Sequence, residues 1–337
     1  MNKVKSLKII LLFDVSVQLS QEQYNSYWTS KDWKNERDVR NALTKLGHEV
    51  IPFGLYDDIE GLIQLVKKEK PDVVFNMSEA FSGHRAFESN VTALMQMVGV
   101  PFTGTGPMSL QLCKDKGLTK VVLNYHQVLT PQFIVCKKGK SMRPLKEMTY
   151  PAFVKPLELE SSEGISQSSY VENEKQAKER VQFIHQKYGV DAIVEEFIDG
   201  REVYVSVLGN DKLVTFPPRE LFFKQVPESE PKFATFNSKW NTAYRKKWGI
   251  DSGWAKSMPE SLQKKIDMTC KKIYRVLGMQ GFGRIDLRIK GEDIYFIEAN
   301  PNPSIAKSED YALSASKAGL EYDELISKIV TLSLNAA

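Results

Sequence analysis

Two short segments near the carboxyl end of the chain combine acidic, basic and amide side chains in a pattern suited to a metal ion and a phosphate group. They read Gly-Arg-Ile-Asp, ending at Asp286, and Phe-Ile-Glu-Ala-Asn-Pro, ending at Pro301. Because side chains alternate along a strand, Arg284 and Asp286 share one face of the first segment. For the same reason, Glu298 and Asn300 share one face of the second. Carboxylate and amide oxygens are the ligands that Mg²⁺ prefers, and an arginine suits a phosphate.

These segments are expected to form a hairpin, with strands at 284–290 and 294–298. A three-residue turn at 291–293 would place Asp286 opposite Glu298 and Arg284 opposite Asn300. A two-residue turn would shift the pairing by one residue and separate these pairs. The alternative is an exposed hairpin with ordinary surface charges, but the apolar residues between the charged ones favour a buried opposite face. The sequence does not decide between these two registers. We expect a metal site at the hairpin if the turn has three residues.

Lysines, serines and glutamates in the middle of the chain form a second candidate site. Lys116 and Lys155 each lie at the boundary of an expected element. The Ser-Ser-Glu-Gly sequence at 161–164 could offer backbone N–H groups to phosphate oxygens. The acidic segment 195–202 follows an apolar run and could hold a ribose and an adenine amino group, although a solvated surface explains it equally well. Neither the Walker pattern nor the G-x-G-x-x-G dinucleotide pattern occurs.

Strands and helices alternate along the first part of the chain, which predicts a parallel, doubly wound α/β unit. After residue 114 the pattern is that of a small α+β unit. The length of 337 residues is compatible with two or three domains. We predict an N-terminal α/β domain at 1–107, a central subdomain at 108–192 and a C-terminal subdomain carrying the metal site at 193–337. The expected strands lie at 8–13, 49–53, 72–75, 132–136, 152–155, 192–198 and 202–208, besides the two of the hairpin.

The segment 14–35 is unusually long for a loop, which is uncommon without a function. It carries Tyr24, Tyr27, Trp28 and Trp33. We favour a hydrophobic flap that packs on the first domain. The alternative is that some of these rings line a substrate pocket.

Composition excludes several classes of protein. The net charge of +4, with 46 basic and 42 acidic residues, is too small to indicate a nucleic-acid partner without a clustered patch, and none is visible. Three scattered cysteines form no disulfide framework or metal spacing, so a reducing cytoplasm is expected. No stretch approaches the ~20 apolar residues of a membrane span, and the apolar run at 9–13 is too short for a signal peptide. A homodimer is left open.

The order of these motifs resembles the ATP-grasp ligases, and specifically the D-alanine–D-alanine ligases. The resemblance rests on Lys-Asp-Lys at 114–116, Val-Lys-Pro at 154–156, the serine loop, Glu-Glu-x-Ile-x-Gly-x-Glu at 195–202 and the hairpin. Gly-Val-Pro-Phe-Thr-Gly at 99–104 also resembles a segment of that family. The similarity covers nearly the whole chain, from residue 36 to the C-terminal helix.

The resemblance implies an ATP-grasp fold with ATP between the central and C-terminal parts, and two Mg²⁺ ions held by Asp286, Glu298 and Asn300. It further implies a reaction through an acyl phosphate, with Arg284 stabilising the intermediates. The family's first-substrate residues correspond to Glu36, Ser161 and Trp240, with Lys239 retained beside the tryptophan. It also implies which residues contact ATP. The phosphates would contact Lys116, Lys155, Ser161, Ser162 and Gly164, the adenine Glu195, Glu196 and Ile198, and the ribose Glu202.

The substrate half departs from the family pattern. Trp240 replaces a tyrosine, and the family's His-Gly-x-x-Gly-Glu-Asp-Gly loop is replaced by a segment that contains His84 and Arg85. The family's terminal Gly and Ser correspond to Ser304 and to the vicinity of Ser308 and Glu309, where a carboxylate would repel a substrate carboxylate.

We therefore predict an ATP-dependent carboxylate–amine ligase that joins an amino acid to another amino acid or a larger carboxylate. The predicted partners are small molecules rather than nucleic acid or membrane. Two alternatives are a genuine D-alanine–D-alanine ligase with a divergent pocket and a non-catalytic ATP-binding module.

Overall fold

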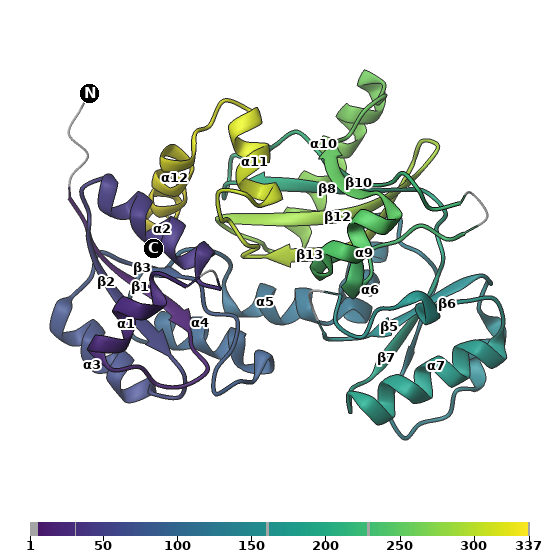
Figure 1. Ribbon diagram of the computed structural model, residues 1–337, viewed down its shortest axis with the longest axis horizontal. Helices are drawn as coiled ribbons and strands as arrows, with labels where there is room; N and C mark the ends of the chain where they lie inside the picture. Colours follow the sequence, from purple (N-terminus) through teal and green to yellow (C-terminus); the bar gives the residue numbers. More distant parts are fainter. Residues whose placement is uncertain (1–5, 31, 160–161, 228–229, 336–337) are drawn as a thin grey trace.

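The computed structural model describes residues 6–30, 32–159, 162–227 and 230–335. The described strands form three separate sheets, which lie around a common centre (Figure 1). The N-terminal sheet lies at the left in this view, the central sheet at the lower right and the C-terminal sheet above. Among the described helices, none is long and apolar enough to cross a membrane.

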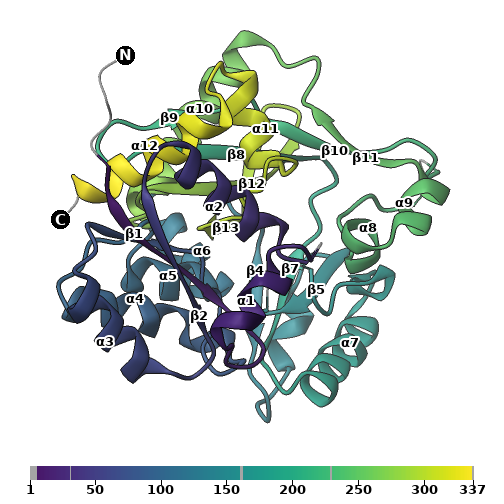
Figure 2. The same ribbon diagram turned by 60° about the vertical axis from the view of Figure 1, so that its left-hand side comes forward.

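The N-terminal sheet is parallel, with the strand order β2-β1-β3, as the alternating pattern predicts. β1 is buried along almost its whole length because helices cover both of its faces. Figure 2 shows α2 and α3 on opposite sides of this sheet. The elements of this part are β1 (Lys8–Asp14), α1 (Gln21–Tyr27), α2 (Lys34–Lys45), β2 (Glu49–Leu55), α3 (Ile59–Glu69), β3 (Val73–Asn76), η1 (Arg85–Phe87), α4 (Glu88–Met97) and α5 (Pro107–Lys114).

The aromatic segment between β1 and α2 packs on the N-terminal sheet. Phe13 makes edge-to-face contacts with Tyr24, Trp28 and Trp33 at centroid distances of 6.2, 5.5 and 5.3 Å. The Tyr24 hydroxyl accepts a hydrogen bond of 2.7 Å from the Gly54 backbone N–H. None of these rings lines either of the two main cavities. The structure therefore favours the packed flap over a substrate-lining loop.

The central sheet is antiparallel, with the strand order β4-β7-β5-β6. β7 pairs with both β4 and β5, so it belongs to this sheet. A boundary at residue 192 would cut this strand, and strand pairing places the end of the central part after Glu196 instead. The elements are α6 (Lys116–Tyr125), β4 (Phe133–Cys136), η2 (Arg143–Glu147), β5 (Ala152–Pro156), η3 (Gln167–Ser169), β6 (Tyr170–Val171), α7 (Glu174–Lys187) and β7 (Ala192–Glu196).

The C-terminal sheet is also antiparallel, with the order β11-β10-β8-β12-β13 and with β9 beside β8. Its core face packs on α10, whose buried side chains recur at helical spacing. The strands are β8 (Arg201–Leu208), β9 (Val214–Thr215), β10 (Arg219–Phe223), β11 (Ile250–Trp254), β12 (Phe282–Lys290) and β13 (Asp293–Pro301). The helices are α8 (Phe236–Trp240), α9 (Thr242–Trp248), α10 (Glu260–Val276), α11 (Asp310–Lys317) and α12 (Tyr322–Leu334).

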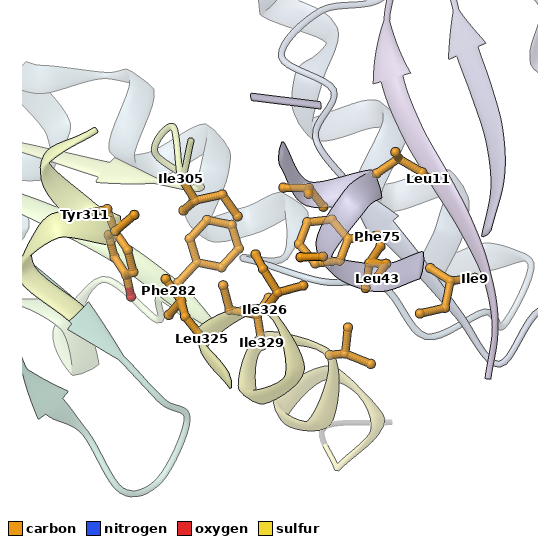
Figure 3. Packing of buried hydrophobic residues seen from close by; sticks show 14 of the residues in the cluster. Ile9, Leu11, Leu43, Phe75, Phe282, Ile305, Tyr311, Leu325, Ile326 and Ile329 are labelled. Atoms are coloured by element: carbon orange, nitrogen blue, oxygen red, sulfur yellow. The ribbon is translucent and has the colours of Figure 1, made fainter. Parts of the chain in front are cut away.

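The last helices return to the N-terminal part and join it to the C-terminal sheet. Leu325, Ile326 and Ile329 of α12 lie between Leu43 and Phe75 on one side and Phe282 and Tyr311 on the other (Figure 3). All of these side chains are buried. Because one apolar cluster spans elements from both ends of the chain, burial holds the two parts in a fixed relation.

Replacing Tyr24 with phenylalanine tests whether the aromatic segment is structural. The substitution leaves the Gly54 N–H without its buried acceptor, which costs about 1–3 kcal/mol. We expect urea unfolding to show this loss, while the KM values for substrates do not change. Tyr125→Phe is the matched control, because Tyr125 is 84% exposed. Altered KM values with unchanged stability would contradict the packed-flap interpretation.

Candidate active site

The β12–β13 hairpin brings the predicted metal ligands together, but not through the expected turn. Lys290 pairs with Asp293, so the turn has two residues rather than three. Gly291 in this turn has a φ of +61°, which a glycine adopts readily. A shift in register follows between Asp286 and Leu287, where β13 contains one unpaired residue, Ile297. This β-bulge restores the pairing of Asp286 with Glu298 and of Arg284 with Asn300.

The hairpin belongs to a row of facing residues that crosses the C-terminal sheet. Directly opposed residues on adjacent strands point to the same face of a sheet. From β13 to β11 the row consists of Glu298, Asp286, Tyr204, Arg219 and Trp254. Glu298, Tyr204 and Arg219 of this row line the larger cavity, and Asp286 lines the smaller one.

Arg284 and Asp286 form a two-pronged ion pair on this face of the sheet. Arg284 Nε and Nη2 donate to the Asp286 carboxylate at 2.7 and 2.9 Å. Burial raises the pKa of Asp286, although Arg284 opposes this effect. Burial would lower the pKa of Arg284, but Asp286 and its other charged neighbours raise it overall. Asp286 can therefore coordinate a metal ion only if its carboxylate oxygens are shared with Arg284 or if this ion pair breaks.

Glu298 is held ionised by lysines from other elements. Lys116 Nζ lies 3.2 Å from Glu298 Oε1 and donates to the Leu159 carbonyl at 2.7 Å. Burial alone would raise the pKa of Glu298, but the charges of Lys116, Lys155 and Lys239 lower it to about 2. Glu298 is therefore an anion at every physiological pH.

A second buried cluster places Glu195 between two lysines. Lys155 Nζ lies 3.0 Å from Glu195 Oε2, and Lys120 Nζ lies 3.2 Å from Oε1. Burial would raise the pKa of Glu195, but the two ammonium groups lower it overall. Lys155 and Glu195 line the smaller cavity, whereas Lys120 lines neither cavity. Glu195 is thus the counter-ion of two lysines as well as a wall of the smaller cavity.

The smaller cavity, of 90 Å³, lies between the central and C-terminal sheets. Its walls include the predicted Ser162, Glu196, Ile198 and Glu202, together with Phe153 and other apolar side chains. Glu202 accepts a hydrogen bond of 2.7 Å from the Tyr204 hydroxyl and one of 2.8 Å from Arg288 Nη2. An apolar slot with a few fixed polar groups suits a flat heteroaromatic ring.

The serine loop lies between the two cavities. Ser161 falls outside the described residues, while Ser162 and Gly164 have φ values of +61° and +74°. A Cβ atom at Gly164 would approach Pro156 Cγ to 2.7 Å, so glycine is needed here. The Arg180 guanidinium donates to the Gly164 carbonyl and fixes the end of this loop on α7.

The larger cavity has a volume of 1190 Å³ and contains most of the predicted substrate residues. Trp240 is on its wall and is 63% exposed. The Lys34 ammonium donates to the Ser308 hydroxyl at 2.5 Å. The other predicted residues on this wall are Arg85, Lys116, Gly164, Lys239, Arg284, Glu298, Asn300 and Ser304.

Two predicted substrate residues do not line this cavity. The His84 ring packs edge-on against Phe87 at a centroid distance of 5.6 Å. Glu36 lies in the first turn of α2, near Asp14 and Glu79, and Glu79 does line the cavity. Burial, with repulsion from Asp14 and Glu79, raises the pKa of Glu36 to about 7.

The structure adds residues that the sequence reasoning missed. Arg219 lines the far end of the larger cavity, pairs with Asp310 at 2.9 Å and lies over the Trp254 ring. Arg245 also lines this cavity and donates to the Ser238 carbonyl. Lys120, beside Glu195, was also missed. The sequence carried a signal for this residue, because Lys120 follows Lys116 by one helical turn and both lysines therefore lie on one face of α6.

The donor set fits a divalent metal ion. No group of three or more histidine, cysteine, aspartate or glutamate side chains suited to a metal occurs within the described ranges. The hairpin offers two carboxylates and one amide, and such a set is complete only with further oxygens from phosphates and water. The Asn300 amide nitrogen is buried without a hydrogen-bond partner. Asn300 lines the larger cavity, where its amide oxygen suits a hard cation and its amide nitrogen would donate to an acceptor on a bound ligand.

Comparison with known proteins finds similarity along nearly the whole chain. The family model "D-ala D-ala ligase C-terminus" matches residues 112–331. The D-alanine–D-alanine ligase of Pseudothermotoga lettingae is 29% identical over 302 residues, covering 88% of this chain and 92% of that protein. The Bacillus anthracis D-alanine–D-alanine ligase complexed with ATP has a TM-score of 0.74 at 19% identity, covering 98% of both chains. VanG D-Ala:D-Ser ligase from Enterococcus faecalis has a TM-score of 0.71 at 20% identity, covering 98% of this chain and 100% of that one.

The raised pKa of Glu36 predicts a pH-dependent stability. In the folded state the Glu36 carboxyl keeps its proton up to about pH 7, whereas its ordinary pKa is 4.5. Ionisation of Glu36 therefore destabilises the fold as the pH rises from 4.5 to 7. The stability of Glu36→Gln relative to wild type should therefore increase from pH 4.5 to pH 7 in urea unfolding. Glu60→Gln, at an exposed site on α3, is the control. A difference in stability between Glu36→Gln and wild type that is independent of pH would contradict the half-buried, repelled carboxylate.

Proposed function

The chain belongs to the D-alanine–D-alanine ligase family. From this premise we propose a ligase whose ATP-binding residues follow the family pattern and whose substrate-binding residues differ from it. Membership makes it an ADP-forming ATP-grasp ligase that acts on small amino-acid substrates with ATP and a divalent metal ion. The metal-ligand hairpin, with its paired Asp286 and Glu298 beside Lys116 and Arg284, is the observation that carries the catalytic part of this proposal. We propose Mg²⁺ as the metal and the cytoplasm as the location, where the three buried thiols stay reduced.

In this proposal the smaller cavity takes the adenine ring and the two lysines take the phosphates. Glu196 and Ile198 contact the adenine beside Glu195, and Glu202 contacts the ribose. Lys116 lines the larger cavity and Lys155 the smaller one, so phosphates that extend from one cavity into the other would meet both lysines. Ser162 and Gly164 would offer backbone N–H groups to the phosphates, and we propose the same role for Ser161, which lies outside the described residues.

Asp286, Glu298 and Asn300 would together hold two Mg²⁺ ions. When bound, the ions neutralise charge on the transferred phosphoryl group. Because Arg284 and Asp286 are paired, Asp286 would have to share its carboxylate oxygens between Arg284 and a bound ion.

The reaction proceeds in two displacements. A carboxylate oxygen of the first substrate attacks the γ-phosphorus, the bond to ADP breaks and an acyl phosphate forms. The amine of the second substrate then attacks the acyl carbon, loses a proton and expels inorganic phosphate. Arg284 and Lys239 face this region and stabilise the negative charge that develops on the carbonyl oxygen.

The proposed change in substrate rests on the walls of the larger cavity. Trp240 presents an indole N–H donor, which cannot accept a hydrogen bond. Glu309 and Asp310 line the cavity at the start of α11, and Asp310 is paired with Arg219. Two adjacent carboxylates disfavour a simple carboxylate clamp for a second D-alanine. The aromatic segment contributes nothing to this argument, because it packs away from the cavity.

The metal-ligand proposal predicts that Asp286→Asn and Glu298→Gln each abolish ADP formation. Each substitution removes one ionised ligand, and we expect ATP turnover to fall by about 10³-fold or more. Coupled measurement of ADP release tests this. Glu292→Gln, at an exposed site in the hairpin turn, is the matched control. Unchanged turnover in both variants would mean that the metal binds elsewhere.

The substrate proposal predicts that D-alanine alone does not support turnover. Phosphate release with ATP, Mg²⁺ and D-alanine should stay well below the range of about 1–10³ s⁻¹ that is typical of enzymes. A screen of pairs of D- and L-amino acids should contain at least one pair that reaches this range. A rate within it for D-alanine alone would favour a genuine D-alanine–D-alanine ligase.

A further inference from the structure

Lys120 is a buried lysine that neither the nucleotide nor the substrate contacts account for. Its side chain is 0% exposed, and it lines neither of the two cavities. It follows Lys116 by one turn on α6 and therefore points towards the same side of the helix. A buried ammonium group costs several kcal/mol unless its protons are used. The partners of Lys120 therefore show what it does.

The partners of Lys120 connect two sheets. Its ammonium donates to the backbone carbonyl of Ile297 at 2.8 Å, and it lies 3.2 Å from Glu195 Oε1. It also lies 5.1 Å from the centre of the Phe296 ring. Two of these three partners are consecutive residues of β13, and the third belongs to β7.

Ile297 is the residue at which β13 bulges. Phe296 is opposite Leu287 and Glu298 is opposite Asp286, so Ile297 has no opposing residue. The extra residue of a bulge is left without its ladder partner, so the partly buried Ile297 carbonyl is open to a donor from another element. Lys120 supplies that donor from outside the sheet. β13 is an edge strand, so its outer side is accessible to α6.

Loss of the bulge would reverse the face of every residue after it. Without the bulge, the register set by the two-residue turn would pair Asp286 with Ile297 and Ile285 with Glu298. Ile285 is fully buried on the core face. Glu298 and Asn300 would then point away from the cavity, and Asp286 would lose its neighbouring carboxylate.

We propose that Lys120 is a positioning residue that maintains the bulged register of β13 and thereby holds Glu298 and Asn300 on the cavity face. This inference rests on the proposed role of Asp286, Glu298 and Asn300 as metal ligands. It assigns Lys120 no contact with nucleotide, substrate or metal. The competing role is that Lys120 serves only as a counter-ion of Glu195.

Removing the bulge residue separates these two roles. Lys120→Met removes the donor and leaves the Ile297 carbonyl without a partner. Deleting Ile297 removes that carbonyl as well, and β13 then runs regularly from Phe296 opposite Leu287 to Glu298 opposite Asp286. The deletion should therefore compensate for the loss of Lys120 if the lysine maintains the register. It cannot compensate for the loss of a counter-ion.

The experiment measures Mn²⁺ binding by electron paramagnetic resonance at saturating ADP, with no turnover required. We expect Lys120→Met to weaken Mn²⁺ binding by about 10–100-fold, the usual effect of removing a group that orients metal ligands. The double variant, Lys120→Met with Ile297 deleted, should bind Mn²⁺ within a few-fold of wild type. Lys265→Met is the matched control, because Lys265 donates to the Glu292 carbonyl at the other end of the same hairpin.

Each outcome decides between the roles. Wild-type affinity in Lys120→Met, or a double variant no better than Lys120→Met, would overturn the inference. If Lys120→Met does not fold, a folded double variant supports the inference and an unfolded one contradicts it. Glu298→Gln is measured in parallel: if it binds Mn²⁺ as wild type does, the proposed metal site fails rather than the role of Lys120.

Discussion

The placement of Glu298 opposite Asp286 is the constraint on which the rest of the site depends. The two carboxylates come from adjacent strands of one sheet, and a shift of one residue would separate them. The turn alone gives the wrong register, and the bulge at Ile297 corrects it. Around this point the chain gathers Lys116, the Arg284 ion pair and the loop at residues 162–164. The fold can be understood as the means by which the central and C-terminal parts of the chain bring these groups together at the hairpin.

Electrostatic balance explains why the charged groups come in sets. Burying a lone ammonium or carboxylate is costly, whereas a hydrogen-bonded pair is tolerated. Lys116 is balanced by Glu298, and Glu195 is shared by Lys120 and Lys155. Lys116 and Lys155 also line the cavities where a nucleotide would bring phosphate charge. Phosphate binding would therefore exchange one set of ion pairs for another, rather than fill a site with unpaired charge.

Much of the fold could be predicted from the sequence, because strands and helices there have clear periodicity. The parallel N-terminal sheet and the positions of β12 and β13 follow from local patterns. The register of the hairpin does not, because it depends on a bulge stabilised by Lys120 from another element. For the aromatic segment the sequence favours the packed flap but does not exclude a pocket lining, because rings that pack on a sheet and rings that line a pocket have the same composition. The expected strands include none between residues 219 and 254, which contain the short elements β10, α8, α9 and β11.

Crystals of the protein with Mn²⁺ and a non-hydrolysable ATP analogue would test the central claim most directly. Anomalous scattering locates the metal without any assumption about the reaction. The account predicts Mn²⁺ density within coordination distance of oxygens of Asp286, Glu298 and Asn300, with the phosphates beside Lys116 and Lys155. Metal density coordinated by other side chains, or a β13 register in which Glu298 faces the core, would contradict it.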